Sequence, residues 1–136
     1  MKQLFSLFLL LTFGLTQAQT VSSPSGKIML NFKLSDSGQP TYSVNYKAKS
    51  VIVNSELGVK LKDKPALDTN FEIQSSKNST FNESWKPVLG EQASIVNHYN
   101  ELVVSLVQKS TNVKVNLVFR AFDEGVAFRY DFPKQK

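Results

Sequence analysis

The sequence predicts an all-β protein, an antiparallel β-sandwich, and three features support this fold class. Apolar and polar residues alternate with a period of two in four segments, which places one side of each strand on a core. Turn-forming residues separate these segments, and no window of ten or more residues has a convincing helical period. Strands at short, regular spacing are typical of a sandwich.

The first strands are expected at residues 28–34 and 42–46, where apolar side chains recur at every second position. The turn-forming residues 23–26 precede the first of these strands. Residues 36–40, which include a glycine and a proline, separate the two. This half of the chain therefore begins with a pair of adjacent strands joined by a short connection.

The middle of the chain has a less regular pattern. Residues 51–61 are ambiguous, and the sequence at 55–58 favours a break between two short strands. Residues 75–82 are polar and are expected to form a loop. Pro87 lacks a backbone donor, so a central strand around it is not expected. Residues 102–107 are apolar at five of six positions, which predicts a strand covered on both faces.

The last two strands are expected at residues 113–121 and 126–132, both with clear alternation. Residues 109–112 are a predicted hairpin tip. Asp123-Glu124-Gly125 is predicted to be a three-residue hairpin loop in which Gly125 takes a positive φ. The chain stops soon after a strong strand, so the domain in residues 19–136 is expected to be incomplete at its carboxy end.

Residues 1–18 have the pattern of a secretory signal peptide. Lys2 supplies a positive start, residues 4–15 are almost wholly apolar, and Thr16-Gln17-Ala18 ends the segment with a small residue. A membrane-spanning helix needs about 20 apolar residues, so cleavage after Ala18 is expected rather than an uncleaved anchor. The sequence therefore predicts a secreted protein with no membrane association after cleavage.

Composition excludes several classes of protein. The chain has no Cys, which excludes a disulfide framework, a thiolate-rich zinc or iron–sulfur site and a lipoprotein anchor. Its formal net charge is +5, and its basic residues form no cluster or Arg-rich stripe. Nucleic acid is therefore not expected as a partner.

Six sequence blocks occur in an order that resembles the amino-terminal domain of glycoside hydrolase family 97. They are SGK at 25–27, GQPTYSV at 38–44, SELGV at 55–59, WKPVLGE at 85–91, NHYNEL at 97–102 and FRAFDEGVAFRY at 119–130. The resemblance covers essentially the whole chain after residue 18. It implies a periplasmic or secreted α-glucosidase or α-galactosidase that acts on α-linked oligosaccharides.

The resemblance also implies a division of labour in the full-length enzyme. The amino-terminal domain is a β-super-sandwich of the carbohydrate-binding type, and this chain resembles roughly its first half. That domain packs against a catalytic (β/α)8 barrel of the same polypeptide and helps to complete its active site. The catalytic carboxylates lie on the barrel, so no catalytic residue is expected in this chain. A calcium ion near the catalytic centre is possible in the full-length enzyme. Its ligand from the sandwich is expected beyond Lys136, so no metal site is expected here.

One stretch concentrates the residue types that bind sugars, although the same residues are also typical of packing. Aromatic rings stack on sugar rings, and carboxylates and amides bind hydroxyl groups. Two alternatives stay open, namely direct contact with substrate and a role at the surface that faces the barrel. The candidate substrate-binding or interdomain residues are Trp85, Gly90, Glu91, Asn97, His98, Tyr99 and Glu101.

Arg120 and Arg129 are the only arginines, and they flank the predicted loop at 123–125. They are expected either to clamp carboxylates on the barrel or to form a cross-strand ion pair with Asp131 or Glu124. No spacing of carboxylates positions a catalytic pair, so independent hydrolysis is not expected. The alternative function is a free-standing secreted module, either carbohydrate-binding or structural, without catalysis.

Overall fold

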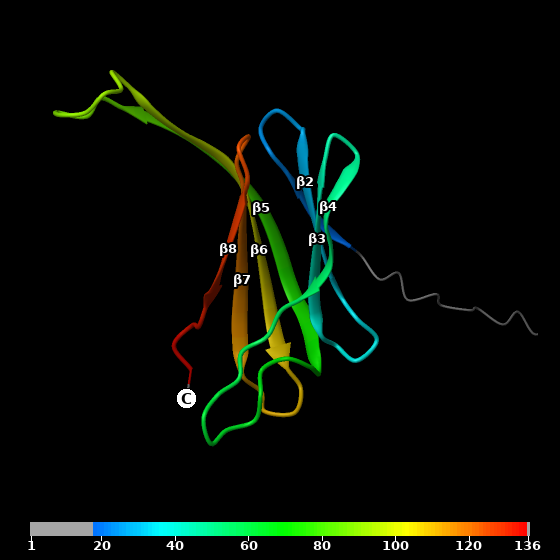
Figure 1. The fold of residues 1–136 in the computed structure, drawn as a ribbon. Helices are drawn as coiled ribbons and strands as arrows, with labels where there is room; N and C mark the ends of the chain where they lie inside the picture. The colour runs from blue at the N-terminus through cyan, green and yellow to red at the C-terminus, as the bar shows by residue number, and fades with distance from the viewer. Residues whose placement is uncertain (1–17, 136) are drawn as a thin grey trace, which may run out of the picture.

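Within the described residues, two antiparallel sheets of four strands pack face to face (Figure 1). The structure is a computed structural model that describes residues 18–135, so the predicted signal peptide lies outside it apart from Ala18. Both sheets follow chain order. The first sheet contains β1 (Gln19–Ser22), β2 (Ile28–Leu34), β3 (Pro40–Tyr46) and β4 (Lys49–Glu56). The second sheet contains β5 (Phe71–Trp85), β6 (Ile95–Gln108), β7 (Lys114–Ala121) and β8 (Val126–Asp131).

The core lies between the two sheets, as the period-two alternation predicts, and the all-β sandwich is confirmed. Phe32 of the first sheet and Phe119 of the second are both fully buried, and their ring centroids are 5.6 Å apart. Because side chains of a strand alternate between its two faces, every second residue of β2, of β7 and of β6 from Leu102 onward enters this layer. Other fully or almost fully buried members are Leu30, Leu102, Val104, Leu106, Leu117 and Ala121.

The predicted loop at 75–82 is wrong, because these residues lie within β5. This strand pairs with β6 in an unbroken antiparallel register from Ser75–Ser105 to Trp85–Ile95. Its side chains from Gln74 onward are exposed. They do not pack in the core, so the segment can form a strand without an alternating row of apolar residues. Backbone pairing with a neighbouring strand, rather than its own side-chain pattern, makes this segment a strand.

Some polar side chains of β5 and β6 also close one edge of the sandwich. Asn78 Nδ2 donates to the backbone oxygen of Thr20 at 3.4 Å, and Asn100 Nδ2 donates to that of Ser22 at 2.8 Å. Thr80 Oγ1 donates to Asn100 Oδ1 at 2.7 Å. The edge strand β1 therefore receives hydrogen bonds from side chains of the facing sheet, which reduces the risk of pairing with another chain.

Several connections differ from the expected ones. The β7–β8 hairpin closes with the Phe122 N–H donating to the Gly125 oxygen at 2.8 Å. The expected positive φ at Gly125 is wrong, since its φ lies outside the left-handed region. Asp123 and Glu124 also avoid that region, so this turn does not require a glycine. By contrast, the predicted tip at 109–112 is confirmed, with Asn112 at a φ of 58°.

Residues 51–61 also depart from the expected pair of short strands. β4 runs unbroken to Glu56, and beyond the break at Leu57-Gly58 the chain makes a single bridge, between Val59 and Leu67. Residues 102–107 are confirmed as part of a strand, although the outward Val103 and Ser105 are only half-buried. None of the elements in residues 18–135 is a helix long and apolar enough to cross a membrane.

Asp123 connects the two sheets at the end of the sandwich and makes their contact dependent on pH. Its carboxylate accepts a hydrogen bond from the Ser25 backbone N–H at 2.9 Å. Hydrogen bonds from the side chain and the backbone of Ser25 lower the pKa of Asp123 from its ordinary value of 3.8. The folded state therefore binds this proton more weakly than the unfolded state does. The ionised Asp123 therefore stabilises the folded state above pH 3.8, and this contribution is lost as the pH falls through the lower pKa that Asp123 has in the folded state.

We expect Asp123→Asn to reduce the loss of stability on acidification, because the variant has no carboxylate to protonate there. The measurement is the melting temperature at steps from pH 6 to pH 2.5, compared with the unchanged protein. Glu124→Gln is the matched control, since within residues 18–135 no hydrogen bond joins Glu124 to another element. Identical acid profiles for Asp123→Asn and the unchanged protein would contradict this role for Asp123.

Candidate functional site

The hairpin of β5 and β6 extends past the rest of the second sheet as a two-stranded arm (Figure 1). We define the arm as residues 81–99, because β7 pairs with β6 only from Asn100 onward. A two-stranded hairpin by itself is at best marginally stable in water. The arm is nevertheless rich in exposed large apolar side chains, namely Phe81, Trp85, Val88, Leu89 and Val96. Such a composition indicates a surface that contacts another molecule or another part of the same one.

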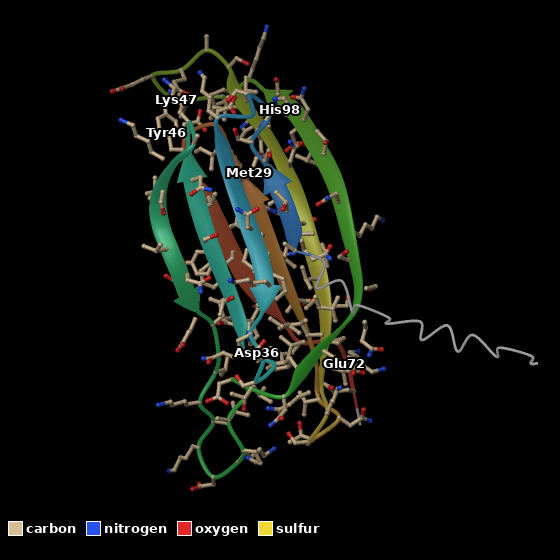
Figure 2. All side chains as sticks on the ribbon, turned by 90° about the vertical axis from the view of Figure 1, so that its right-hand side faces the viewer. Met29, Asp36, Tyr46, Lys47, Glu72 and His98 are labelled. Carbon is tan, nitrogen blue, oxygen red and sulfur yellow. The ribbon has the colours of Figure 1, made fainter. Side chains whose placement is uncertain are left out.

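Register divides the side chains of the arm between two faces. The pairs Phe81–Tyr99 and Trp85–Ile95 point to the side that continues the outer face of the second sheet, away from the core. His98 pairs with Asn82 and points to the opposite side. Figure 2 shows His98 and Glu72 near opposite ends of the second sheet. Gly90 and Glu91 lie in the loop at the tip, between the two strands.

An aromatic cluster forms the root of the arm on the outer face. Tyr99 is only 6% exposed. Phe81 stacks on it with a centroid distance of 5.1 Å and an interplanar angle of 23°, and Phe122 lies at 5.1 Å. The guanidinium of Arg120 lies over the same ring, 4.4 Å from its centroid. Tyr99 is therefore held in place by its neighbours, whereas Phe81 has an exposed side.

Arg120 forms an ion pair with Glu101, in which Nε donates to Oε2 at 2.7 Å. The predicted pairing with Asp131 or Glu124 is therefore wrong for Arg120. The reason is register, since Arg120 lies directly opposite Glu101 across β6 and β7. Arg129 is exposed on the same face, and no ion pair joins it to any other residue of 18–135. Whether either arginine contacts another domain stays a prediction.

The structure thus brings together only part of the predicted site. Tyr99, Glu101 and Arg120 are in contact, while Asn97 and Trp85 lie further along the same face of the arm. Sequence reasoning missed Phe81 and Phe122. For Phe81 there was a signal, because Phe81 and Trp85 are an even number of residues apart and would share one face of a strand.

The loop at the tip is open on all sides. Val88 and Leu89 are 98% and 90% exposed, the highest values among the exposed large apolar side chains in the described part of the chain. Gly90 has a φ of 147°, and a Cβ atom added there would meet only Pro87 Cγ, at 3.9 Å. No neighbouring backbone in residues 18–135 therefore restricts the loop around Gly90.

The described residues do not fit a metal ion. No group of three or more His, Cys, Asp or Glu side chains within 18–135 is arranged to hold one. Glu101, which has a suitable carboxylate, is already paired with Arg120. Calcium in a full-length enzyme therefore stays an expectation from the resemblance alone, and no property of this chain is derived from it.

Comparison with known proteins gives consistent matches. The family model described as "Glycosyl-hydrolase 97 N-terminal" matches residues 21–136. A glycoside hydrolase family 97 enzyme from Pseudoalteromonas sp. strain K8 is similar in its complexes with panose and with acarbose, at 35% identity and a TM-score of 0.80. A β-arabinopyranosidase is similar at 25% identity and a TM-score of 0.77.

The matches differ greatly in how much of each protein they cover. The Pseudoalteromonas match covers 86% of this chain but only 18% of the enzyme, and the β-arabinopyranosidase match covers 88% and 19%. This chain therefore spans about a fifth of the length of the enzymes it resembles. What those enzymes act on is a property of their whole polypeptides.

Proposed function

Because this chain belongs to glycoside hydrolase family 97 and corresponds to its N-terminal domain, we propose that it is the N-terminal part of a secreted enzyme that cleaves α-linked oligosaccharides. In this proposal a catalytic barrel of the same polypeptide carries the reacting carboxylates. The present domain packs against that barrel and helps to complete its active site. The observation that supports the proposal most strongly is the 35% sequence identity to a family 97 enzyme in complex with panose, which is an α-linked gluco-oligosaccharide.

The arm supplies the physical basis for packing against a barrel. Val88 and Leu89 are almost fully exposed here, and burying such a side chain is worth about 1.5–3 kcal/mol. A two-stranded ribbon gains little support from itself, so a covering surface would stabilise both its strands and its tip. Binding sites are frequent at domain interfaces, so a substrate held between this domain and the barrel would lie within reach of such an arm.

Hydrolysis by the full-length protein is the first test. We expect it to release p-nitrophenol from p-nitrophenyl α-glucoside or α-galactoside, whereas residues 19–136 alone release none. The comparison of the two chromogenic substrates assigns the sugar. Activity of residues 19–136 alone would contradict the proposal, because this domain would then carry its own catalytic groups. Failure of the full-length protein to cleave either substrate would favour a non-catalytic module.

Leu89→Asp in the full-length protein tests the packing of the arm. We expect a lower melting temperature and a lower kcat/KM together, because an unpaired carboxylate is costly in an apolar contact. Val53→Asp is a matched control, since Val53 is 79% exposed but lies on the edge strand β4 of the other sheet. If Leu89→Asp were as harmless as a typical surface substitution, the tip would not be a domain contact.

A further inference from the structure

We propose that the outer face of the arm is a subsite for an extended α-linked gluco-oligosaccharide, built from Phe81, Trp85, Glu83 and Asn97. This inference rests on the proposed function and adds a ligand, a location and a direction to it. The four side chains share one face because they occupy alternate positions in two paired strands. They lie outside the aromatic packing of the sandwich core and point away from the first sheet.

Two exposed rings define the length of this surface. Phe81 is 39% exposed and Trp85 is 45% exposed. They are four residues apart on one strand, which separates them by about 13 Å at a rise of 3.3 Å per residue. That span exceeds one pyranose ring, so the arrangement fits an oligosaccharide that runs along the arm. Flat aromatic faces suit the apolar faces of such sugars.

A polar pair lies between the two rings. Glu83 and Asn97 are directly opposite each other across β5 and β6. Within residues 18–135 neither side chain makes a hydrogen bond or an ion pair, so both are available to hydroxyl groups. A carboxylate accepts and an amide both donates and accepts, which matches a hydroxyl that can do the same. This alternation of ring and polar pair favours a saccharide over an apolar protein surface.

The root of the arm is organised in advance. Phe81 is stacked on Tyr99, and the ring of Tyr99 also contacts Phe122 and Arg120. Glu101 holds Arg120 in place through the 2.7 Å ion pair. Because Phe81 loses little freedom when a ligand stacks on it, binding carries a smaller entropic cost. Tyr99, Arg120 and Glu101 are therefore positioning residues for this surface.

The exposed aliphatic residues of the arm lie elsewhere, and only the half-buried Ile95 accompanies Trp85 on the ring-bearing face, which separates this surface from the proposed domain contact. Val88 and Leu89 are in the tip loop, and Val96 points to the face opposite Trp85. One part of the arm can thus contact the barrel while its ring-bearing face remains available. A long substrate would then reach from the active site onto the arm, whereas a short one would not.

The test is the preference of the full-length enzyme for long over short substrates. The substrates are maltohexaose and p-nitrophenyl α-glucoside, and the measured quantity is the ratio of their kcat/KM values. We expect Trp85→Ala to lower this ratio about tenfold, which corresponds to about 1.4 kcal/mol. Phe81→Leu, which keeps an apolar side chain over Tyr99, is expected to lower it in the same direction. Ser84→Ala is the matched control, since Ser84 is adjacent to Trp85 but points to the opposite face.

An unchanged ratio in Trp85→Ala and Phe81→Leu would overturn the subsite. So would equal losses on both substrates together with a lower melting temperature, because that result indicates a protein contact instead. If the unchanged enzyme cleaves neither maltohexaose nor p-nitrophenyl α-glucoside, the subsite is decided by calorimetric titration of the full-length protein with maltohexaose. The proposed function fails only if p-nitrophenyl α-galactoside is not cleaved either. Binding that weakens about tenfold in Trp85→Ala supports the subsite, and absent or unaltered binding overturns it.

Discussion

Replacing Phe119 with alanine is expected to lower the free energy of unfolding by about 3–5 kcal/mol. Phe119 is fully buried and lies at the centre of the aromatic core. Its ring centroid is 5.6 Å from that of Phe32, 6.4 Å from that of Tyr42 and 6.1 Å from that of Phe128. Truncation would leave a cavity bordered by both sheets, which relax only partly to fill it.

The measurement is urea denaturation of the purified protein followed by far-ultraviolet circular dichroism. Phe132→Ala is the control, because Phe132 is 48% exposed and its truncation removes far less buried surface. We expect the control to cost below about 1 kcal/mol. A loss of stability for Phe119→Ala no larger than that of the control would show that the two sheets do not pack through this ring.

Gly38→Ala is expected to destabilise the fold by about 2–5 kcal/mol, through two separate effects. Gly38 has a φ of +71°, which a side chain disfavours. A Cβ atom there would also lie 2.7 Å from the Phe71 backbone oxygen and 2.8 Å from its nitrogen. The turn before β3 approaches the start of β5 closely, and the Phe71 N–H donates to the Gly38 oxygen at 3.0 Å.

Gly26→Ala separates the two effects. Gly26 has almost the same φ, +72°, but a Cβ atom there would meet nothing within 4 Å. We expect this control to lower the free energy of unfolding by about 1–2 kcal/mol, from the conformational effect alone. The difference in unfolding free energy between the two variants measures the close approach of the turn at Gly38 to the start of β5. Equal costs at both positions would mean that the backbone shifts to accommodate the methyl group.

The candidate site shows why the family and the fold were easier to predict than the contacts. The six sequence blocks and the alternating strands are readable locally, and both the family and the sandwich are confirmed. The grouping of Tyr99, Glu101 and Arg120 depends instead on which residues of β6 and β7 lie opposite each other. Arg120 was expected to pair near its own hairpin, but its partner comes from the preceding strand.

The polar segment 75–82 illustrates a second limit. Single-sequence reasoning assigns strands from an apolar face, and this segment has none. It forms a strand because its backbone pairs with the long strand β6, and because one of its polar side chains donates a hydrogen bond to β1. Because residues 75–82 were expected to form a loop, the shared face of Phe81, Glu83 and Trp85 in β5 was not expected, and neither was the ring-bearing face of the arm.

The sequence by itself determined the strands that border the core, since the alternation in β2, β3, β7 and β8 reflects the local period of an extended chain. The tertiary structure alone decided the turn between β3 and β4, where Lys47 and Ala48 both take a positive φ without any glycine. It also decided the length of the arm and the partner of Arg120. These features depend on which residues of neighbouring strands lie opposite each other, and that pairing outweighs local preference because it satisfies the backbone groups and the half-buried charges of Arg120 and Glu101.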